Sequence, residues 1–499
     1  MLLEGLWGGF QSALTVTNLL YCFVGVLLGT IVGVLPGLGP GATSALLLPL
    51  TFVLPPALGI IMLAGVYYGA MYGGSTTSIL MNVPGEASSV PTCWDGFQMT
   101  RKGRAGEALA IAAIASFMAG TFGLIVLSLV GPSLAGLALR FGPPEYFGLF
   151  FLSLTLLVSL SGESLIKGLV AGLAGIFLAT VGVDPLNGMP RLTFGVTALL
   201  DGLDVIPVVM GLFGISEVLV TIDQGVGQLY EGKLGRLIPR GRELWAGLAA
   251  SLRGTVVGFF LGLLPGVLTP VGTFLVYDVE KKISRNPERF GTGVIEGVAA
   301  PEAANNAMAQ AGFIPLMCLG IPTGPTLAIL LAALMVYGLQ PGPMLFAQHA
   351  DFAWTVIASM YLGNIMLLVL NLPLVGLWAK LCLLPYRLLA PSIIAVSFVG
   401  AYSVRNSMFD VWVTVAFGTL GYLMKKRDWP SAPFILGFLL GPMTEQALRQ
   451  SLQLSRGSLG VFVASPIAAS LIVAAVGLFM LIAWYRYRPA ATSFFRART

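Results

Sequence analysis

One uncharged stretch decides the fold class of this chain: Ile111-Ala-Ala-Ile-Ala-Ser-Phe-Met-Ala-Gly-Thr-Phe-Gly-Leu-Ile-Val-Leu-Ser-Leu-Val130. A helix needs roughly 20 predominantly apolar residues to cross the hydrocarbon core of a membrane, and this stretch supplies them. Apolar and polar residues do not alternate along it, so it is not typical of a membrane β-strand. A similar stretch covers residues 467–483. The sequence therefore predicts helices that cross a membrane.

The composition of the whole chain supports this prediction. Of its 499 residues, 56% are hydrophobic and only 10% are charged, whereas a soluble domain usually carries about 25% charged residues. The mean hydropathy of +0.88 agrees. The 63 glycines would allow helices to approach closely or to break inside a membrane. We therefore expect an all-α polytopic membrane protein with on the order of 10–14 membrane segments.

The basic residues are clustered, and their positions predict the orientation. Positively charged loops of membrane proteins lie mainly in the cytoplasm. Threading the apolar stretches between the clusters places the C-terminus in the cytoplasm and the N-terminus on the opposite face. The clusters run from Arg101 to Arg104, from Lys233 to Arg253, from Lys281 to Arg289, from Lys425 to Arg427 and from Arg486 to Arg498.

Both halves of the chain carry the same motif. Residues 29–37, Gly-Thr-Ile-Val-Gly-Val-Leu-Pro-Gly, match residues 258–266, Gly-Phe-Phe-Leu-Gly-Leu-Leu-Pro-Gly. The segment after the second motif is too short to cross a membrane before the next basic loop, so we expect a re-entrant hairpin there. The matching hairpin of the first half would enter from the opposite side. Inverted repeats with broken helices and a midplane site are the usual plan of a secondary transporter.

This repeat sets the predicted domains. Residues 1–242 form the first repeat, residues 243–450 the second, and residues 451–499 a final transmembrane span with a basic cytoplasmic tail. Each repeat is expected to hold one re-entrant hairpin and one discontinuous helix. The hairpin tips are predicted near Pro36 and Pro265, and the helix breaks near Pro84 and Pro322.

Three clusters combine helix-breaking residues with hydroxyl or amide side chains, at residues 36–44, 75–89 and 302–326. Non-helical backbone survives at membrane depth only where protein buries it or where it lines a wet cavity. The N–H groups at the start of a half-helix suit a carboxylate. The alternative is that these residues only let helices pack closely. The candidate substrate-binding residues are Gly37, Gly39, Thr43, Ser44, Ser75, Thr76, Thr77, Ser78, Asn82, Gly85, Ser88, Asn305, Asn306, Thr323, Gly324 and Thr326.

A coupling cation would need oxygen ligands among the same clusters. Asn82, Glu302 and Asn306 are the candidates, because amide oxygens suit Na⁺ and an intramembrane carboxylate is a functional candidate by default. Glu302 could carry a coupling proton or could lie at a wet helix end, and Glu86 has the same status. The sequence leaves Na⁺ and H⁺ open, and we expect no cofactor and no metal beyond a possible Na⁺.

Other functional classes find little support. The sequence contains neither an H-E-x-x-H nor a G-x-S-x-G motif, so it predicts a protein that is not an enzyme. The alternatives to a transporter are a passive anion channel and, less favoured, a membrane-embedded enzyme. Two hairpins from opposite faces favour alternating access over a channel. The modest net charge of +5 is explained by orientation and does not indicate nucleic-acid binding.

A known family shares several of these motifs. They are Gly33-Val-Leu-Pro-Gly-Leu-Gly-Pro40, Tyr68-Gly-Ala-Met-Tyr-Gly-Gly-Ser75, Asn82-Val-Pro-Gly85, Gly211-Leu-Phe-Gly-Ile-Ser-Glu217, Gly297-Val-Ala-Ala-Pro-Glu-Ala-Ala-Asn-Asn306 and Leu319-Gly-Ile-Pro322. With them the chain resembles the large membrane subunit of the tripartite tricarboxylate transporters over nearly its whole length.

The resemblance implies a permease of the bacterial inner membrane that is driven by a cation gradient. It implies two protein partners, a small four-helix membrane subunit and a periplasmic substrate-binding protein. With the orientation predicted from the basic clusters, the N-terminus is then expected in the periplasm. Family substrates are carboxylates, including citrate, other di- or tricarboxylates and some aromatic acids. The segment Pro322-Thr-Gly-Pro-Thr326 follows a family motif where the family varies, so it bears on substrate choice, and citrate itself is not inferred.

Overall fold

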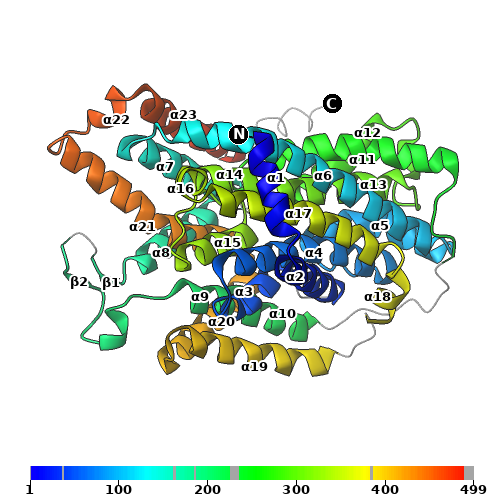
Figure 1. Ribbon diagram of the computed structural model, residues 1–499, viewed down its shortest axis with the longest axis horizontal. Helices are drawn as coiled ribbons and strands as arrows, with labels where there is room; N and C mark the ends of the chain where they lie inside the picture. The colour runs from blue at the N-terminus through cyan, green and yellow to red at the C-terminus, as the bar shows by residue number, and fades with distance from the viewer. Residues whose placement is uncertain are drawn as a thin grey trace, which may run out of the picture. The chain divides into compact units, whose positions relative to one another are not determined.

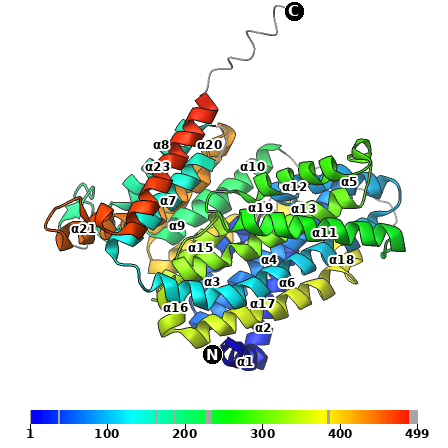
Figure 2. The same ribbon diagram turned by 90° about the horizontal axis from the view of Figure 1, so that it is seen from above.

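The computed structural model describes residues 2–35, 39–160, 164–184, 187–224, 235–381 and 386–487 (Figure 1, Figure 2). These residues are mostly helical. The strands found among them are the short β1 (Gly182–Val183) and β2 (Pro190–Arg191), which pair antiparallel. Seven of the described helices are long and apolar enough to cross a membrane. The predicted all-α polytopic membrane fold is confirmed.

The candidate membrane spans are distributed along the whole described chain. They are Val16–Val34, Pro56–Met81, Ala105–Ala138, Val205–Asp223, Gly241–Gly262, Ala350–Asn371 and Pro466–Trp484. Shorter apolar helices cover Leu165–Ala179, Pro325–Val336 and Ala390–Arg405. Such short helices are typical of segments that do not cross a membrane alone.

Tertiary contacts divide the chain into two compact units, each built from both halves of the sequence. The larger unit comprises Met1–Leu139 and Leu203–Arg427, and the smaller comprises Arg140–Gly202 and Asp428–Thr499. This division does not coincide with the repeat boundaries expected at residues 242 and 450. The inverted repeats therefore stay a prediction.

The larger unit consists of helices and short helical turns. Its first segment contains α1 (Leu2–Ala13), α2 (Val16–Val34), α3 (Pro40–Thr51), α4 (Pro56–Met81), η1 (Ala87–Ser89), α5 (Val90–Arg101) and α6 (Ala105–Ala138). Its second segment begins with α9 (Val205–Val209), η3 (Met210–Ile215), α10 (Ser216–Gln224), α11 (Gly241–Gly262), α12 (Thr269–Ile283), η4 (Pro287–Arg289) and α13 (Glu296–Ala311). It continues with α14 (Phe313–Leu319), α15 (Pro325–Val336), α16 (Pro343–Gln348), α17 (Ala350–Asn371), α18 (Val375–Leu381), α19 (Tyr386–Arg405) and α20 (Met408–Lys426).

Glycines let the long helices of the larger unit touch backbone to backbone. A Cβ added to Gly29 of α2 would lie 2.5 Å from the Val66 carbonyl oxygen of α4, and one added to Gly258 of α11 would lie 2.7 Å from the Ala304 carbonyl oxygen of α13. Close approach through small residues is how membrane helices gain packing contacts. The same spacing recurs at Gly25 and Gly33 on α2 and at Gly254 and Gly262 on α11. Both halves therefore build one helix pair in the same way.

The smaller unit packs its helices through glycines as well. A Cβ at Gly175 of α8 would lie 2.0 Å from the Phe434 carbonyl oxygen of α21. Two ion pairs join α21 to the β-hairpin region, between Arg449 and Asp184 at 2.9 Å and between Arg191 and Glu445 at 2.8 Å. The elements of this unit are α7 (Pro143–Leu160), α8 (Leu165–Ala179), β1, β2, η2 (Thr197–Leu199), α21 (Ser431–Leu454), α22 (Val461–Ala464) and α23 (Pro466–Tyr487).

The helix breaks fall where proline and glycine predict them. α4 ends at Met81 and η1 begins at Ala87, so the chain is broken around Pro84. α14 ends at Leu319 and α15 begins at Pro325, which brackets Pro322. α11 and α12 are joined through Pro265, whereas the expected tip at residues 36–38 lies outside the described residues.

Candidate functional site

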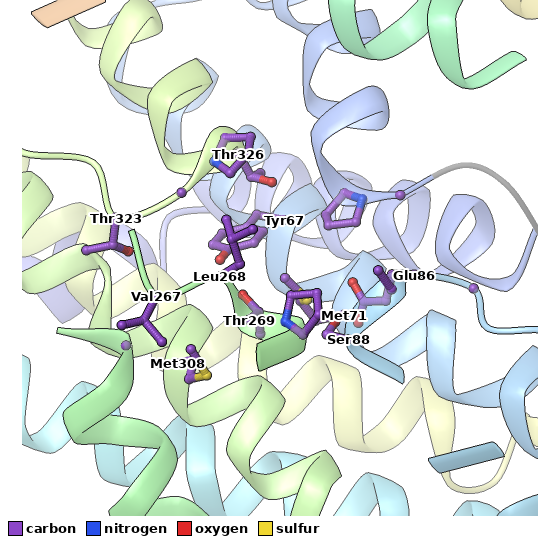
Figure 3. Close-up of a pocket in the computed structure, with 18 of the residues that line it drawn as sticks. Tyr67, Met71, Glu86, Ser88, Val267, Leu268, Thr269, Met308, Thr323 and Thr326 are labelled. Atoms are coloured by element: carbon purple, nitrogen blue, oxygen red, sulfur yellow. The ribbon is translucent and has the colours of Figure 1, made fainter. Parts of the chain in front are cut away.

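A cavity of about 300 Å³ lies in the larger unit at a place where several helices begin (Figure 3). The helices α3, α12 and α15 start at its wall, each with a proline in its first two positions. Proline is favoured there because the N–H group that it lacks would have no partner within the helix. The cavity is lined by Gly39, Pro40, Tyr67, Met71, Gly85, Glu86, Ala87, Ser88, Glu217, Gly262, Val267, Leu268, Thr269, Pro270, Met308, Thr323, Gly324, Pro325 and Thr326.

The helix starts give this cavity a positive local potential. The N-cap residues Gly39, Leu268 and Gly324 make no side-chain capping hydrogen bond. The first N–H groups of each helix therefore have no partner in the helix and none from a cap. Free N–H groups and the positive end of the helix dipole favour a negatively charged ligand. The arrangement suits a carboxylate.

Segments from both halves of the sequence meet at the cavity. A Cβ added to Gly41 of α3 would lie 3.5 Å from Thr326 Oγ1 at the start of α15. The N–H group of Gly266, between α11 and α12, donates to the Thr323 carbonyl oxygen at 3.4 Å. Figure 3 shows Thr323 and Val267 on one side of the cavity and Glu86 on the other. This hydrogen bond holds the helix break around Pro322 against the hairpin tip at Pro265 and Gly266, which precedes α12.

The loop after α4 reaches the cavity because glycines let it pass close to α2 and α4. Asn82 ends α4 in the left-handed conformation, with φ of 56°, and is exposed. A Cβ at Gly85 would lie 2.5 Å from Gly74 Cα and 2.8 Å from the Gly33 carbonyl oxygen. Only glycine fits there. This contact positions the residues that follow Gly85, and among them Glu86 lines the cavity.

Two carboxylates lie in or near the cavity, the buried Glu302 and the half-buried Glu86. Glu302 is fully buried and receives hydrogen bonds from the hydroxyl groups of Ser75 and Thr92, the latter at 2.5 Å. Glu86 accepts a hydrogen bond from Asn305 Nδ2 at 2.7 Å. Glu302 does not line the cavity, whereas Glu86 does. In the part of the chain that the structure describes, neither carboxylate forms an ion pair.

The neighbouring asparagines of α13 point to different partners. Asn306 Nδ2 donates to Ser116 Oγ of α6 at 2.7 Å and to the Glu302 carbonyl oxygen at 3.2 Å. Asn305 faces Glu86 instead. Successive helical residues are rotated by about 100°, so the two side chains leave the helix in different directions. Asn305 contacts a residue of the cavity wall, and Asn306 joins α13 to α6.

Several predicted site residues bond to their own helices. Thr43 donates to the Gly39 carbonyl oxygen at 3.0 Å. Thr77 and Ser78 both donate to the Gly74 carbonyl oxygen, at 3.1 and 3.0 Å. The hydroxyl group of Ser44 is buried without a hydrogen-bond partner. The bonds of Thr43, Thr77 and Ser78 are typical of hydroxyl groups inside helices, and none of these three residues lines the cavity.

The cavity brings six of the predicted residues together. They are Gly39, Gly85, Ser88, Thr323, Gly324 and Thr326. Ser75 and Thr76 instead border a cavity of about 10 Å³ that lies beside Ser116. Gly37 lies outside the described residues.

Other cavity residues were not predicted from the sequence. Leu268 to Pro270 form the start of α12, and a proline just after a glycine-containing tip is the same signal as at Pro40 and Pro325. Met71 and Met308 belong to apolar helices, and nothing in the sequence separates them from other core residues. Such residues are found only from the packing.

One ion pair lies at the edge of the cavity. Glu217 of α10 lines it, and its carboxylate pairs with Lys425 Nζ of α20. Both side chains are partly exposed, at 28% for Glu217 and 25% for Lys425. The carboxylate next to the anion-favouring helix starts is therefore neutralised by a basic residue.

Comparison with known proteins assigns the chain to a family. The profile of the tripartite tricarboxylate transporter TctA family matches residues 19–436. The chain belongs to the tripartite tricarboxylate transporter TctA family. Members of this family are multi-pass membrane components of a three-part transporter, so the class expected from the motifs is confirmed.

Two relatives of the chain come from Agrobacterium vitis. The chain is 46% identical over 488 residues to an uncharacterized 52.8 kDa protein in the TAR-I ttuC' 3' region, which covers 96% of this chain and 95% of that protein. It is 47% identical over 215 residues to an uncharacterized protein in the TAR-II ttuC' 3' region, covering 43% of this chain and 89% of that protein. No solved structure matches the chain.

Proposed function

We propose that this TctA-family chain is the permease of a secondary transporter that imports a di- or tricarboxylate, or a related organic acid, together with Na⁺ or H⁺. One observation carries the proposal: α3, α12 and α15 begin at the same cavity without side-chain caps. Such helix starts favour an anion. The volume of about 300 Å³ is that of a small-molecule site.

The chemistry of the wall suits a site that must release its ligand. Among the described residues, no lysine, arginine or histidine lines the cavity. Backbone N–H groups and the hydroxyl groups of Thr269, Thr323 and Thr326 are neutral donors. Neutral donors form charge-assisted hydrogen bonds with a carboxylate, but they lack the full positive charge and the bidentate geometry of a guanidinium. A co-bound cation would offset the remaining charge of the substrate.

The family description supports two protein partners. In our proposal a periplasmic substrate-binding protein delivers the carboxylate, and a small four-helix membrane subunit completes the permease. The chain would lie in the bacterial inner membrane with a periplasmic N-terminus and a cytoplasmic C-terminus. The description of the family as tripartite supports the number of components.

Transport by the assembled system tests this proposal. The full chain is reconstituted into liposomes with the small subunit, and the binding protein is added outside with labelled citrate or succinate as the probe. We expect saturable uptake that needs an inward Na⁺ or H⁺ gradient and stops when the gradient is dissipated. Uptake that is independent of any gradient would overturn cation coupling. Unitary currents would replace the transporter with the passive anion channel.

A further inference from the structure

Glu86 is a carboxylate at the wall of a cavity that otherwise favours anions. It lies beside Ser88 and across the cavity from Thr323, which precedes the start of α15, as Figure 3 shows. The first turns of α3, α12 and α15 bring no charged side chain to the cavity. The negative charge of an ionised Glu86 would offset the positive potential of these helix starts. It would also repel a carboxylate ligand in the cavity.

Neutral donors alone hold Glu86. Its side chain accepts a hydrogen bond from Asn305 Nδ2 at 2.7 Å, while the Ser89 N–H group donates to its main-chain carbonyl oxygen at 3.1 Å. The titratable groups around it are Tyr67 of α4, Glu302 of α13 and Glu217 of α10. Of these, Glu217 is already paired with a lysine, and the other two bring no positive charge. A carboxylate in this position lacks a compensating cation within the described residues.

Asn305 has an unused oxygen at the same place. The residue is fully buried, yet its Oδ1 atom has no hydrogen-bond partner. Buried polar atoms are nearly always paired, so this oxygen is an acceptor available to a further donor or to a cation. The terminal amide carries a donor and an acceptor on one carbon, and rotation exchanges them. Asn305 can therefore donate to an ionised Glu86 and accept from a protonated one, or its oxygen can bind a cation.

We propose that Glu86 and Asn305 form the binding site of the coupling cation, a proton or Na⁺, and that the neighbouring cavity binds a carboxylate tightly only when this site is occupied. This inference rests on the proposed function. A proton on Glu86 makes the side chain neutral, and its O–H group donates to Asn305 Oδ1. Na⁺ would take oxygen ligands from both residues. Either cation removes the repulsion, which links the binding of the two solutes.

Binding to the full-length protein separates this inference from transport. The purified chain is titrated with citrate and with succinate, and the thermal unfolding midpoint reports binding. The titrations are run at about pH 6 and about pH 8.5 in choline chloride, and at about pH 8.5 in sodium chloride. Relative to choline chloride at about pH 8.5, we expect the apparent Kd to fall 10- to 100-fold either at about pH 6 or in sodium chloride. A change of this order corresponds to the removal of one charge repulsion. The responding arm identifies the cation.

Variants test whether Glu86 causes the dependence of carboxylate binding on pH or Na⁺. Glu86→Gln should bind the probes tightly in all three media, with less than about twofold change between them. Asn305→Ala should reach the wild-type affinity only at a lower pH or a higher Na⁺ concentration. This variant tests the cation site if Glu86→Gln fails to fold. Glu243→Gln is the matched control, because Glu243 pairs with Arg104 and does not line the cavity. It should keep the wild-type dependence.

The failures of the two proposals look different. If the wild type binds citrate or succinate equally in all media, or if Glu86→Gln keeps the wild-type dependence, the cation site is overturned while the anion cavity stands. If neither probe stabilises the wild type or Glu86→Gln in any medium, the anion cavity is overturned, and the cation site with it.

Discussion

The Asp95 carboxylate accepts the hydroxyl hydrogen of Tyr277 at 2.7 Å, which joins α5 to α12. The same carboxylate accepts the N–H groups of Gly293 and Val294 at 2.7 and 2.9 Å, and that of Gly291 at 3.0 Å. Asp95 is fully buried. One side chain thus connects the first half of the sequence to the helix whose start lines the cavity and to the loop before α13.

Asp95→Asn should destabilise the protein more than its small change in shape suggests. The substitution replaces an acceptor oxygen with an NH₂ group that faces buried N–H donors, so donors are left unpaired. We expect a loss of about 2–3 kcal/mol in the free energy of unfolding, seen as a lower unfolding temperature of the purified chain. Tyr277→Phe removes one hydrogen bond and should cost about 1 kcal/mol. Equal losses in both variants would show that the carboxylate does not organise this region.

Gly85→Ala should weaken carboxylate binding by displacing the loop that carries Glu86. The added Cβ would lie 2.5 Å from Gly74 Cα, and backbone atoms cannot give way as a flexible side chain can. We expect the apparent Kd for citrate or succinate to rise by about tenfold or more, because the cavity wall moves. Gly8→Ala is the control, since nothing lies within 4 Å of its added Cβ. Wild-type affinity in Gly85→Ala would contradict this role for the loop.

Thr323→Val should change the KM of transport but not the stability, whereas Asn306→Ala should change the stability but not KM. Thr323 lines the cavity, so losing its hydroxyl group should raise the apparent KM of transport about fivefold at unchanged protein yield. Asn306 bonds to Ser116 and lies away from the cavity wall. Asn306→Ala should therefore lower the unfolding temperature, by a loss of about 2 kcal/mol, and leave KM unchanged. A shift of KM in Asn306→Ala alone would move the substrate site toward α6.

The sequence predicted features that depend on local chemistry. Apolar stretches of membrane-spanning length predicted the helical membrane fold, and proline with glycine predicted the breaks near Pro84 and Pro322. The direction of a side chain depends on packing and could not be predicted. Ser78 and Ser88 belong to one polar cluster, yet Ser78 donates to Gly74 and Ser88 lines the cavity. Composition identifies a polar cluster but not the rotation of each helix within the fold.

The Glu217–Lys425 pair at the edge of the cavity allows a test of charge alone. Removing the lysine leaves Glu217 as an unpaired negative charge beside the anion site. Lys425→Met should therefore raise the apparent Kd for citrate about three- to tenfold, and more at low than at high ionic strength, because salt screens partly exposed charges. Stability should change little, since exposed ion pairs contribute about 0–1 kcal/mol.

The double variant Glu217→Gln with Lys425→Met separates charge from shape. If repulsion by Glu217 causes the loss, removing its charge should restore the apparent Kd to within about twofold of the wild type. Lys426→Met is the matched control, because Lys426 pairs with Asp223 and neither residue lines the cavity. A double variant that binds as weakly as Lys425→Met would mean that the lysine acts through packing of α20 on α10. Restored affinity would show that a single uncompensated carboxylate at the wall controls anion binding.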